Sequence, residues 1–420
     1  MNHKRAVITG LGAITPLGDT VADFWENLLA GRSGVRKITL FDASGLPCQI
    51  AGEIPDFEPT RYLDKKETRR LARSSQIALA AAINAVQDAG LPDTMPEPER
   101  AAVYFGTGIG GLDVYEDNNK VYLEKGYSRV NPFSLPGTIP NMPAFVIGRQ
   151  FQCLGPNFTI TTACATSTQA LGEACELIRR GLADVVISGG TEAMIRDFAL
   201  VGFIAMRALP SSFNDQPEKA SRPFDLHREG FVFSEGAGVL IVEELEHARR
   251  RGARIYAEIA GHAASSDGFH MAAPDPEGAG PARAMNWALS DARLNPGDID
   301  YINAHGSSTI LNDRTETLAI KKVFGEQAYN IPISSTKSML GHAMGATGAL
   351  EAIVCAQAIQ HGWLPPTINY ETPDPDCDLD YVPNQARQVA VNTTLSNSFG
   401  LGGQNACLVL KRYQGKTGEG

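Results

Sequence analysis

The order of strand-like, turn-like and helical segments in this chain begins again after residue 252. The run RIYAEIAG (254–261) is like the earlier run RAVITGLG (5–12), a first strand that leads into a turn. Residues 331–362 combine a strand, a turn of small residues and a helix, as residues 157–181 do. A repeated succession of this kind indicates two α/β units that bury their apolar faces together. The sequence therefore predicts an α/β protein built from two similar halves.

Length and apolar patterning limit how these halves are organised. The 420 residues are enough for two such units with a large core. We place an N-terminal half at 1–252, a C-terminal half at 253–413 and a polar tail at 414–420. No apolar stretch approaches the roughly 20 residues that cross a bilayer, and glycines interrupt the first apolar run too early for a signal peptide. We therefore expect no membrane insertion.

Charge and cysteine content narrow the function further. The net charge of −10 argues against general binding of nucleic acid, whose phosphates attract basic surfaces. The seven cysteines include no CxxC pair, so neither a disulfide framework nor a zinc site is indicated, and a reducing cytoplasm fits. We expect no metal and no other cofactor.

Cys164 falls where a short predicted strand, PNFTI (156–160), gives way to a predicted helix that Gly181 can cap. A thiol at the start of a helix feels the positive end of the helix dipole, which lowers its pKa and populates the nucleophilic thiolate. The neighbouring side chains are small, so another molecule can approach the sulfur. The competing interpretation is a buried cysteine that packs as a small apolar side chain, and this stretch alone leaves both open.

Two of the eight histidines lie on glycine-rich turns after strand-like runs. His305 stands in YINAHGSST and His342 in STKSMLGHAMGATG. A cysteine at a helix start together with two accessible histidines is the set that covalent acyl chemistry needs. Because the two strand–turn–helix units repeat, the symmetry predicts His342 opposite Cys164 in a shared cleft. For each histidine taken alone, a structural role is the competing interpretation.

Three other stretches carry weaker signals. GTGIGG (106–111) resembles a dinucleotide-binding turn, but it lacks the helix-opening third glycine and a clear acidic partner further on. Residues 64–90 predict one long helix with basic side chains crowded into its first turns. Residues 112–145 show no strong period, and we expect an excursion that covers a neighbour or a site.

Four motifs carry a family resemblance: TTACATSTQA, NAHGSST, STKSMLGHAMGATGALEA and NSFGLGGQNA. In this order and spacing they resemble the elongating β-ketoacyl-[acyl carrier protein] synthases of the thiolase superfamily, close to synthase II. The resemblance covers nearly the whole chain and implies the thiolase fold, with five layers in the order α-β-α-β-α, and a homodimer. It also implies a cytoplasmic acyltransferase of fatty acid biosynthesis. Such a ketosynthase joins an acyl group to malonyl carrier protein by decarboxylative Claisen condensation and yields a 3-oxoacyl carrier protein.

The resemblance assigns the chemistry to four residues. Cys164 would attack the acyl thioester and hold the acyl chain. The backbone N–H groups of Cys164 and Leu401 would form the oxyanion hole, where donors face developing charge. His305 and His342 would hydrogen-bond the thioester carbonyl of malonyl carrier protein and stabilise the enolate that loss of CO2 leaves.

Further residues acquire supporting roles from the same resemblance. Lys337 would order His342 and pair with Glu351 as a buried ion pair. The expected substrate-binding residues are Ile109 at the far end of the acyl pocket, Ser307 and Thr309 at the pantetheine arm, and Phe399 beside the gate loop. By residue type alone each is more simply an ordinary core or surface residue, and only the family match favours the functional role.

A basic cluster offers a docking surface for the acyl carrier protein. It comprises Lys65, Lys66, Arg69, Arg70 and Arg73 in the predicted helix, with Arg207 further along the chain. Carrier proteins are typically acidic and this chain is net acidic too, so a local positive patch would overcome the repulsion and steer docking. A solvated helix face is the competing interpretation.

Other activities of the same superfamily remain open. A polyketide ketosynthase subunit would share the Cys-His-His chemistry. A thiolase that condenses CoA esters would need a second cysteine as base, and Cys407 follows the late glycine-rich loop in an apolar run. A non-catalytic chain-length partner would lack the nucleophile, which is present here. The sequence departs from the family pattern near the expected channel and gate, at Ala272, Ile310, Leu311, Asn312, Leu401 and Gln404.

Overall fold

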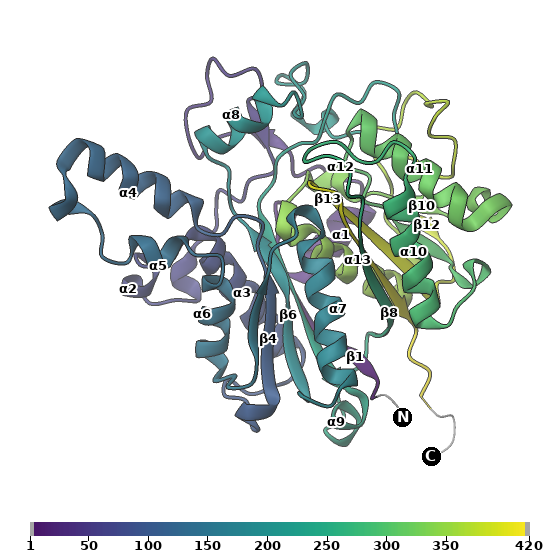
Figure 1. Ribbon diagram of the computed structural model, residues 1–420, viewed down its shortest axis with the longest axis horizontal. Coiled ribbons are helices and arrows are strands. Elements are labelled where there is room, and N and C mark those ends of the chain that lie inside the picture. Colours follow the sequence, from purple (N-terminus) through teal and green to yellow (C-terminus); the bar gives the residue numbers. More distant parts are fainter. Residues whose placement is uncertain (1–3, 416–420) are drawn as a thin grey trace.

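The computed structural model describes residues 4–415, and its largest element is a ten-stranded sheet (Figure 1). The strands of the N-terminal half are β1 (Ala6–Ile14), β4 (Ala101–Gly106), β5 (Asn157–Ile160), β6 (Val185–Glu192) and β7 (Gly236–Glu244). Those of the C-terminal half are β8 (Ala257–Ser266), β9 (Tyr301–Asn303), β10 (Ile333–Ser334), β13 (Thr393–Gly400) and β14 (Gln404–Lys411). Two short pairs lie outside this sheet, β2 (Arg36–Lys37) with β3 (Ile50–Ala51) and β11 (Trp363–Leu364) with β12 (Arg387–Gln388). Most of the predicted polar tail falls beyond the described residues.

The strand order of the large sheet repeats about its centre. The full order is β10-β9-β13-β14-β8-β1-β7-β6-β4-β5. Read outward from the centre, β1-β7-β6-β4-β5 matches β8-β14-β13-β9-β10, and in each set the outermost strands are parallel while the inner pairings are antiparallel. β1 and β8 join the two sets through the pairs Val7–Glu258 and Ile8–Ala257. The predicted pair of similar halves is confirmed, and residue 252 falls between α9 (Leu245–Arg250) and β8.

Helices supply three of five layers (Figure 1). In the middle, α7 (Thr166–Arg179) and α13 (Thr347–His361) both pack against strands of both halves. Outside the N-terminal strands lie α3 (Arg73–Asp88) and α6 (Met142–Phe151), and outside the C-terminal strands lie α10 (Ala279–Ala292) and α11 (Ile310–Phe324). This is the α-β-α-β-α arrangement of the thiolase fold that the resemblance implies.

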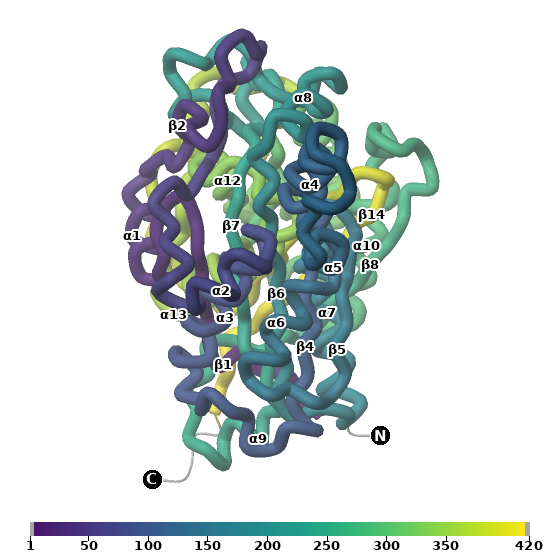
Figure 2. Tube along the Cα trace, turned by 90° about the vertical axis from the view of Figure 1, so that its left-hand side faces the viewer, coloured from purple at the N-terminus to yellow at the C-terminus, as the bar shows by residue number. Residues whose placement is uncertain are grey.

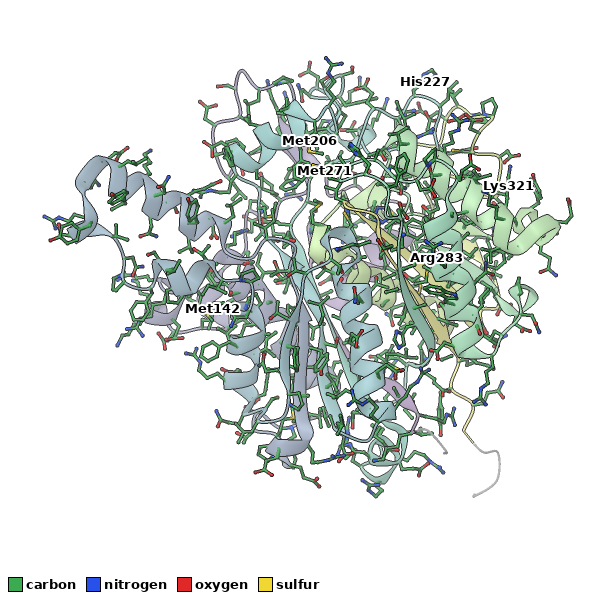
Figure 3. All side chains as sticks on the ribbon, in the orientation of Figure 1. Met142, Met206, His227, Met271, Arg283 and Lys321 are labelled. Carbon is green, nitrogen blue, oxygen red and sulfur yellow. The ribbon has the colours of Figure 1, made fainter. Side chains whose placement is uncertain are left out.

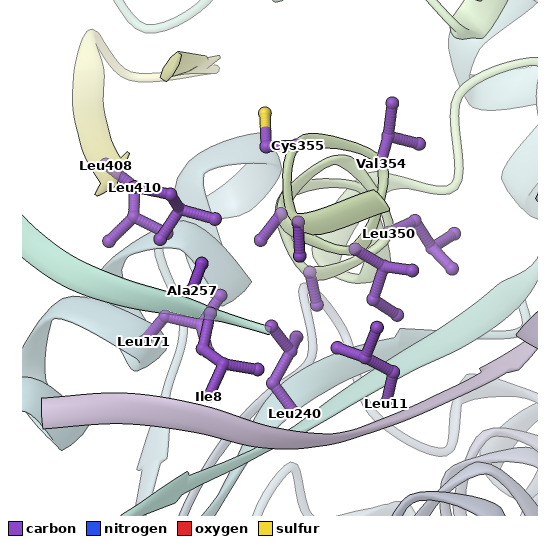
Figure 4. Close-up of a cluster of buried hydrophobic side chains, with 14 of the residues drawn as sticks. Ile8, Leu11, Leu171, Leu240, Ala257, Leu350, Val354, Cys355, Leu408 and Leu410 are labelled. Atoms are coloured by element: carbon purple, nitrogen blue, oxygen red, sulfur yellow. The ribbon is translucent and has the colours of Figure 1, made fainter. Parts of the chain in front are cut away.

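The middle helices are built from small and apolar residues because they are covered by a sheet on both sides. All residues from 347 to 359 in α13 are buried. Leu350 of this helix shares one core cluster with residues of β1, β7 and β14, among them Leu408 (Figure 4). Where α13 meets α7, a Cβ on Gly348 would lie 2.0 Å from Thr168 Oγ1, so this close crossing requires glycine.

The single long helix predicted at 64–90 is wrong. The chain forms a short helix α2 (Lys65–Thr68), turns, and then forms α3. Asp64 caps α2 by accepting hydrogen bonds from the N–H groups of Lys66 and Glu67 over 2.8 and 2.9 Å. The break follows from a long-range contact, because the Arg73 guanidinium at the start of α3 is bound to the buried carboxylate of Glu235.

The predicted excursion at 112–145 is helical. α4 (Leu112–Lys125) projects from the body of the protein, and α5 (Ser134–Thr138) leads back to α6 (Figure 1, Figure 2). No residue of α4 is buried, and Tyr122 and Leu123 are exposed. The remaining α-helices are α1 (Val21–Leu29), α8 (Asp197–Ala205) and α12 (Lys337–Leu340). Within residues 4–415, no helix combines the length and the apolar character that crossing a membrane requires.

Candidate active site

A cavity of about 420 Å³ is lined by residues from both halves. The N-terminal half contributes Cys164, Phe203, Arg207 and Met206, the last of which is labelled in Figure 3. The C-terminal half contributes His305, Ser307, Thr309, His342, Phe399 and Leu401. The sulfur of Cys164 and one ring nitrogen from each of His305 and His342 lie within 4.8 Å of one another. The structure therefore brings together the three residues on which the expected chemistry depends.

The turn that carries Cys164 links β5 to α7. A 3-10 turn precedes the start of the helix at Thr166. Ala163 has φ of 51°, in the left-handed region that residues other than glycine rarely adopt, and Thr166 Oγ1 accepts a hydrogen bond of 2.9 Å from the Thr162 N–H. Gly400 at the end of β13 allows the turn to approach, because a Cβ there would lie 3.2 Å from the Cys164 nitrogen.

The predicted lowering of the Cys164 pKa is wrong. The residue is 5% exposed, and burial raises the pKa of its thiol to about 11, because a buried thiolate loses its hydration. Backbone hydrogen bonds from Leu401 and Cys164 and the charge of Lys337 favour the thiolate without offsetting burial. The sulfur is therefore protonated at neutral pH, and its attack on a carbonyl requires a base. The same two backbone donors lie beside the sulfur, where an oxyanion hole would need them.

Both histidines are neutral at physiological pH. Burial lowers the pKa of His305 and of His342 well below the usual range, and the charge of Lys337 lowers both further. His342 Nδ1 pairs with Thr347 Oγ1 at 3.0 Å, whereas its Nε2 and the Nδ1 of His305 are buried without a hydrogen-bond partner among the described residues. An unpartnered buried nitrogen is destabilising, so an atom that reached either nitrogen and bonded it would be stabilised there.

Main-chain hydrogen bonds hold the histidine-bearing turns in place. The N–H groups of His305 and Gly306 donate to the buried carboxylate of Glu316 over 2.8 and 2.7 Å. Burial raises the pKa of Glu316 to about 7, and these two bonds favour its charged form. The N–H of His342 donates to the carbonyl of Val232 over 2.7 Å.

Lys337 and Glu351 form the buried ion pair that the resemblance implies. Each side chain is 1% exposed, and Lys337 Nζ donates a hydrogen bond to Glu351 Oε1. Burial raises the pKa of Glu351 to about 7, while the charge of Lys337 opposes that rise. No hydrogen bond joins Lys337 to His342 within residues 4–415, so the lysine acts on that imidazole through its charge.

The expected substrate-binding residues divide into two groups. Ser307, Thr309 and Phe399 line the cavity, and the hydroxyls of Ser307 and Thr309 are 2.9 Å apart. Ile109 lies outside the cavity lining and is 42% exposed. Its backbone N–H faces Glu192 while its side chain is open to solvent, so in a single chain Ile109 does not close the pocket.

The basic residues that were expected to dock the carrier protein lie in different surroundings. Arg207 lines the cavity, but no residue of α2 does. The guanidinium of Arg73 is bound within the chain, because it donates two hydrogen bonds of 2.8 Å to Glu235, whose side chain is 0% exposed. Arg70 lies 3.5 Å from Glu67 on the surface, and docking by Lys65, Lys66, Arg69 and Arg70 stays a prediction.

Sequence reasoning missed the buried carboxylates near the cavity. Glu192 ends β6 inside the stretch SGGTEA, and burial raises its pKa to about 7. The glycines before it indicated a turn at a strand end, but nothing local marked the glutamate as buried. Glu316 sits within α11 at a position that reads as an ordinary helix residue.

Other chemistries find little support in the cavity. Cys407 lies on β14 outside the cavity lining, and its thiol donates to Asn397 Oδ1 over 3.3 Å. No second thiol in the described part of the chain therefore faces Cys164, which disfavours the thiolase alternative. Among residues 4–415, the histidine, cysteine and carboxylate groups that come close enough to hold a metal ion are the same Cys164, His305 and His342, a set that zinc accepts.

Known proteins resemble this chain over almost its full length. A family model described as "Beta-ketoacyl synthase, N-terminal domain" matches residues 3–248, and its counterpart "Beta-ketoacyl synthase, C-terminal domain" matches residues 256–371. The chain is 49% identical to "3-oxoacyl-[acyl-carrier-protein] synthase 2" of Synechocystis sp. over 99% of each protein. A solved structure titled "The ishigamide ketosynthase/chain length factor" is 39% identical, with a TM-score of 0.92 over 98% of this chain and 100% of that one. Another, titled "AntDE:AntF (apo): type II PKS acyl-carrier protein in complex with its ketosynthase bound to the hexaketide", is 36% identical with a TM-score of 0.91, over 98% of this chain and 100% of that one.

Proposed function

The chain belongs to the β-ketoacyl synthase family, and on that premise we propose that it is a 3-oxoacyl-[acyl carrier protein] synthase of the synthase 2 type, which elongates fatty acids. The observation that carries the proposal is the meeting of a buried thiol, Cys164, with two buried, neutral imidazoles in one cavity. Identity of 49% to a synthase 2 over the whole chain supports the same reaction.

In the first half-reaction Cys164 accepts the acyl group. A neutral imidazole nitrogen takes the thiol proton while the sulfur attacks the thioester carbonyl of the acyl carrier protein. The backbone N–H groups of Cys164 and Leu401 stabilise the oxyanion of the tetrahedral intermediate. The carrier thiolate then leaves and regains the proton from the imidazole.

The second half-reaction uses His305 and His342 as hydrogen-bond donors to the carbonyl of malonyl carrier protein. Loss of CO2 leaves an enolate, whose negative oxygen is stabilised by the two N–H groups. The enolate carbon attacks the carbonyl of acyl-Cys164. A carbon–carbon bond forms, the carbon–sulfur bond breaks, and the product is a 3-oxoacyl carrier protein two carbons longer.

Product formation tests this proposal. Wild-type protein with acyl and malonyl carrier proteins should yield 3-oxoacyl carrier protein, detected by mass spectrometry. Cys164→Ala should abolish the product, while Cys175→Ala, a matched control at a buried cysteine of α7 that faces the core, should retain it. His305→Ala and His342→Ala should also reduce malonyl decarboxylation. Condensation by Cys164→Ala at the wild-type rate would refute the assignment.

A homodimer is part of the proposal. β5 ends the large sheet, and its outer edge has no partner strand within residues 4–415. Large apolar side chains are exposed there, namely Phe158 on β5, Leu154 just before it and Phe145 on the adjoining α6. An open edge with such a patch supports pairing with a second copy. Phe158→Asp should convert a dimer to a monomer in light scattering after size-exclusion chromatography.

A polyketide ketosynthase subunit is the second candidate. It is favoured by the similarity to the two ketosynthase structures, one of which is titled as a complex with its acyl carrier protein and a hexaketide. Such an enzyme would extend one chain repeatedly on malonyl carrier protein without intervening reduction. The masses of the products distinguish the candidates, because a fatty acid synthase stops after one two-carbon addition until the 3-oxo group is reduced.

A further inference from the structure

The C-terminal half contains a counterpart of the nucleophile turn that carries no nucleophile. Both α7 and α13 begin directly after a 3-10 turn, so Gly345 occupies the position that corresponds to Cys164. The residue before each, Met344 and Ala163, has left-handed φ, 42° and 51°. His342 lies earlier in the same turn and does not itself match Cys164.

The residues that these two turns meet are also counterparts. Glu192 is the last residue of β6, and Gly400 is the last residue of the matching strand β13. Cys164 approaches Gly400, whereas Gly345 approaches the side chain of Glu192. The space beside the second turn is thus filled by a carboxylate from the other half.

Glu192 bonds two turns at once. Its Oε2 accepts hydrogen bonds from the N–H groups of Gly345 over 3.1 Å and Gly108 over 2.7 Å, and its Oε1 accepts one from the Thr107 hydroxyl over 3.0 Å. A Cβ on Gly108 or on Gly345 would lie 2.6 or 2.9 Å from Oε2, so both positions need glycine. The side chain is fully buried, and no lysine or arginine of residues 4–415 forms an ion pair with it. These donors therefore support the carboxylate and tie the turns together.

The hydrogen bond between Gly345 and Glu192 affects the wall of the cavity beside Cys164. Met344, the preceding residue, lines the cavity and belongs to the same apolar cluster as Cys164. His342 has other supports, because its N–H donates to Val232 O over 2.7 Å and its carbonyl accepts from the Ser234 N–H over 3.1 Å. Loss of the Glu192 carboxylate would release Met344 while the imidazole stays in place.

We propose that Glu192 is a positioning residue for acyl loading. Its carboxylate joins the 107–109 and 344–345 turns through hydrogen bonds, which we call the Glu192 clasp, and so holds Met344 against Cys164. The inference rests on the proposed function. It states that acyl transfer to Cys164 depends on the Glu192 clasp and that decarboxylation of malonyl carrier protein does not. Transfer of the acyl group to Cys164 depends on the apolar wall that receives the first carbons of the chain. Decarboxylation of malonyl carrier protein depends on the two histidines.

Three variants separate this role from a general loss of stability. Glu192→Gln keeps the volume but places an amide NH2 against donors that face both oxygens. Thr107→Val removes one donor and keeps the side-chain shape, so it loosens the clasp mildly. Glu243→Gln is the matched control, because Glu243 is equally buried on β7 but is bonded to Thr9, His247 and Arg251 outside the cavity.

Acyl loading, followed by intact-protein mass spectrometry, and CO2 release from malonyl carrier protein are measured for each variant. Glu192→Gln should load about tenfold more slowly than wild type and decarboxylate within about twofold of it, and Thr107→Val should shift loading in the same direction. Glu243→Gln should change neither rate. Equal loss of both rates in Glu192→Gln, or loading within about twofold of wild type in both clasp variants, would overturn the inference. A wild type that neither loads nor decarboxylates would instead overturn the proposed function.

Discussion

Alkylation of Cys164 should accelerate with pH far beyond the point at which an ordinary cysteine reaches its maximum. Burial raises the pKa of this thiol from 9.0 to about 11. At about pH 8 an ordinary thiol is about 9% thiolate, whereas a thiol with a pKa of about 11 is about 0.1% thiolate, roughly a hundredfold less. Because the thiolate is the reactive form, the rate constant should rise about tenfold for each pH unit between about pH 7 and about pH 9.5.

The assay follows iodoacetamide labelling of Cys164 by peptide mass spectrometry. All seven cysteines are buried, and Cys164 is the one that lines the cavity, so its peptide reports on the site. The same protein unfolded in urea is the internal reference, because its thiols titrate with ordinary pKa values. Access to the cavity scales every rate equally, so the pH at which labelling levels off is the diagnostic quantity. Levelling at the same pH as the unfolded reference, or below it, would refute the reasoning. Levelling below about pH 8 would also restore the helix dipole as the dominant influence.

Three further predictions concern stability and docking. Lys337→Met should lower the free energy of unfolding by about 3–5 kcal/mol, because it leaves Glu351 buried and unpaired, and urea denaturation should show partial recovery when Glu351→Leu is added. No recovery in the double variant would contradict the pairing argument. Charge reversal by Lys66→Glu with Arg70→Glu should raise the KM for acyl carrier protein about tenfold at low salt and leave kcat unchanged, whereas an unchanged KM would discard the docking surface. Gly348→Ala should lower the melting temperature and cost about 1–3 kcal/mol, since its Cβ would lie 2.0 Å from a side-chain oxygen of α7, and wild-type stability would show that the helices can move apart.

The two halves could be predicted from the sequence because strand, turn and helix signals are local and recur in the same order. The strand pairing that joins the halves could not be predicted, because the pairing of Val7 with Glu258 joins positions far apart in the chain and leaves no local pattern. The break between α2 and α3 has the same origin. The helical pattern of 64–90 is continuous, and the contact of Arg73 with Glu235 overrides it.

The sequence predicted which residues form the site but not the pKa of Cys164. Cys164, His305 and His342 stand in turns that their glycines and small neighbours make recognisable. Burial is a property of the assembled fold, so the raised pKa of Cys164 could not be derived from its place at a helix start. Glu192 could not be identified from the sequence for the same reason, because its contact with the Gly345 turn of the other half exists only in the assembled fold.

The division of the cavity between the halves has a consequence for the order of synthesis. Cys164 belongs to the part of the chain that leaves the ribosome first, whereas both histidines, Lys337 and Leu401 follow in the second part. A nascent N-terminal half has the thiol but neither a proton acceptor nor the second backbone donor beside it. On the proposed mechanism, Cys164 therefore gains its reaction partners only when the C-terminal half has packed against α7. On that mechanism acyl transfer requires both halves, so the activity that appears after translation should report their packing.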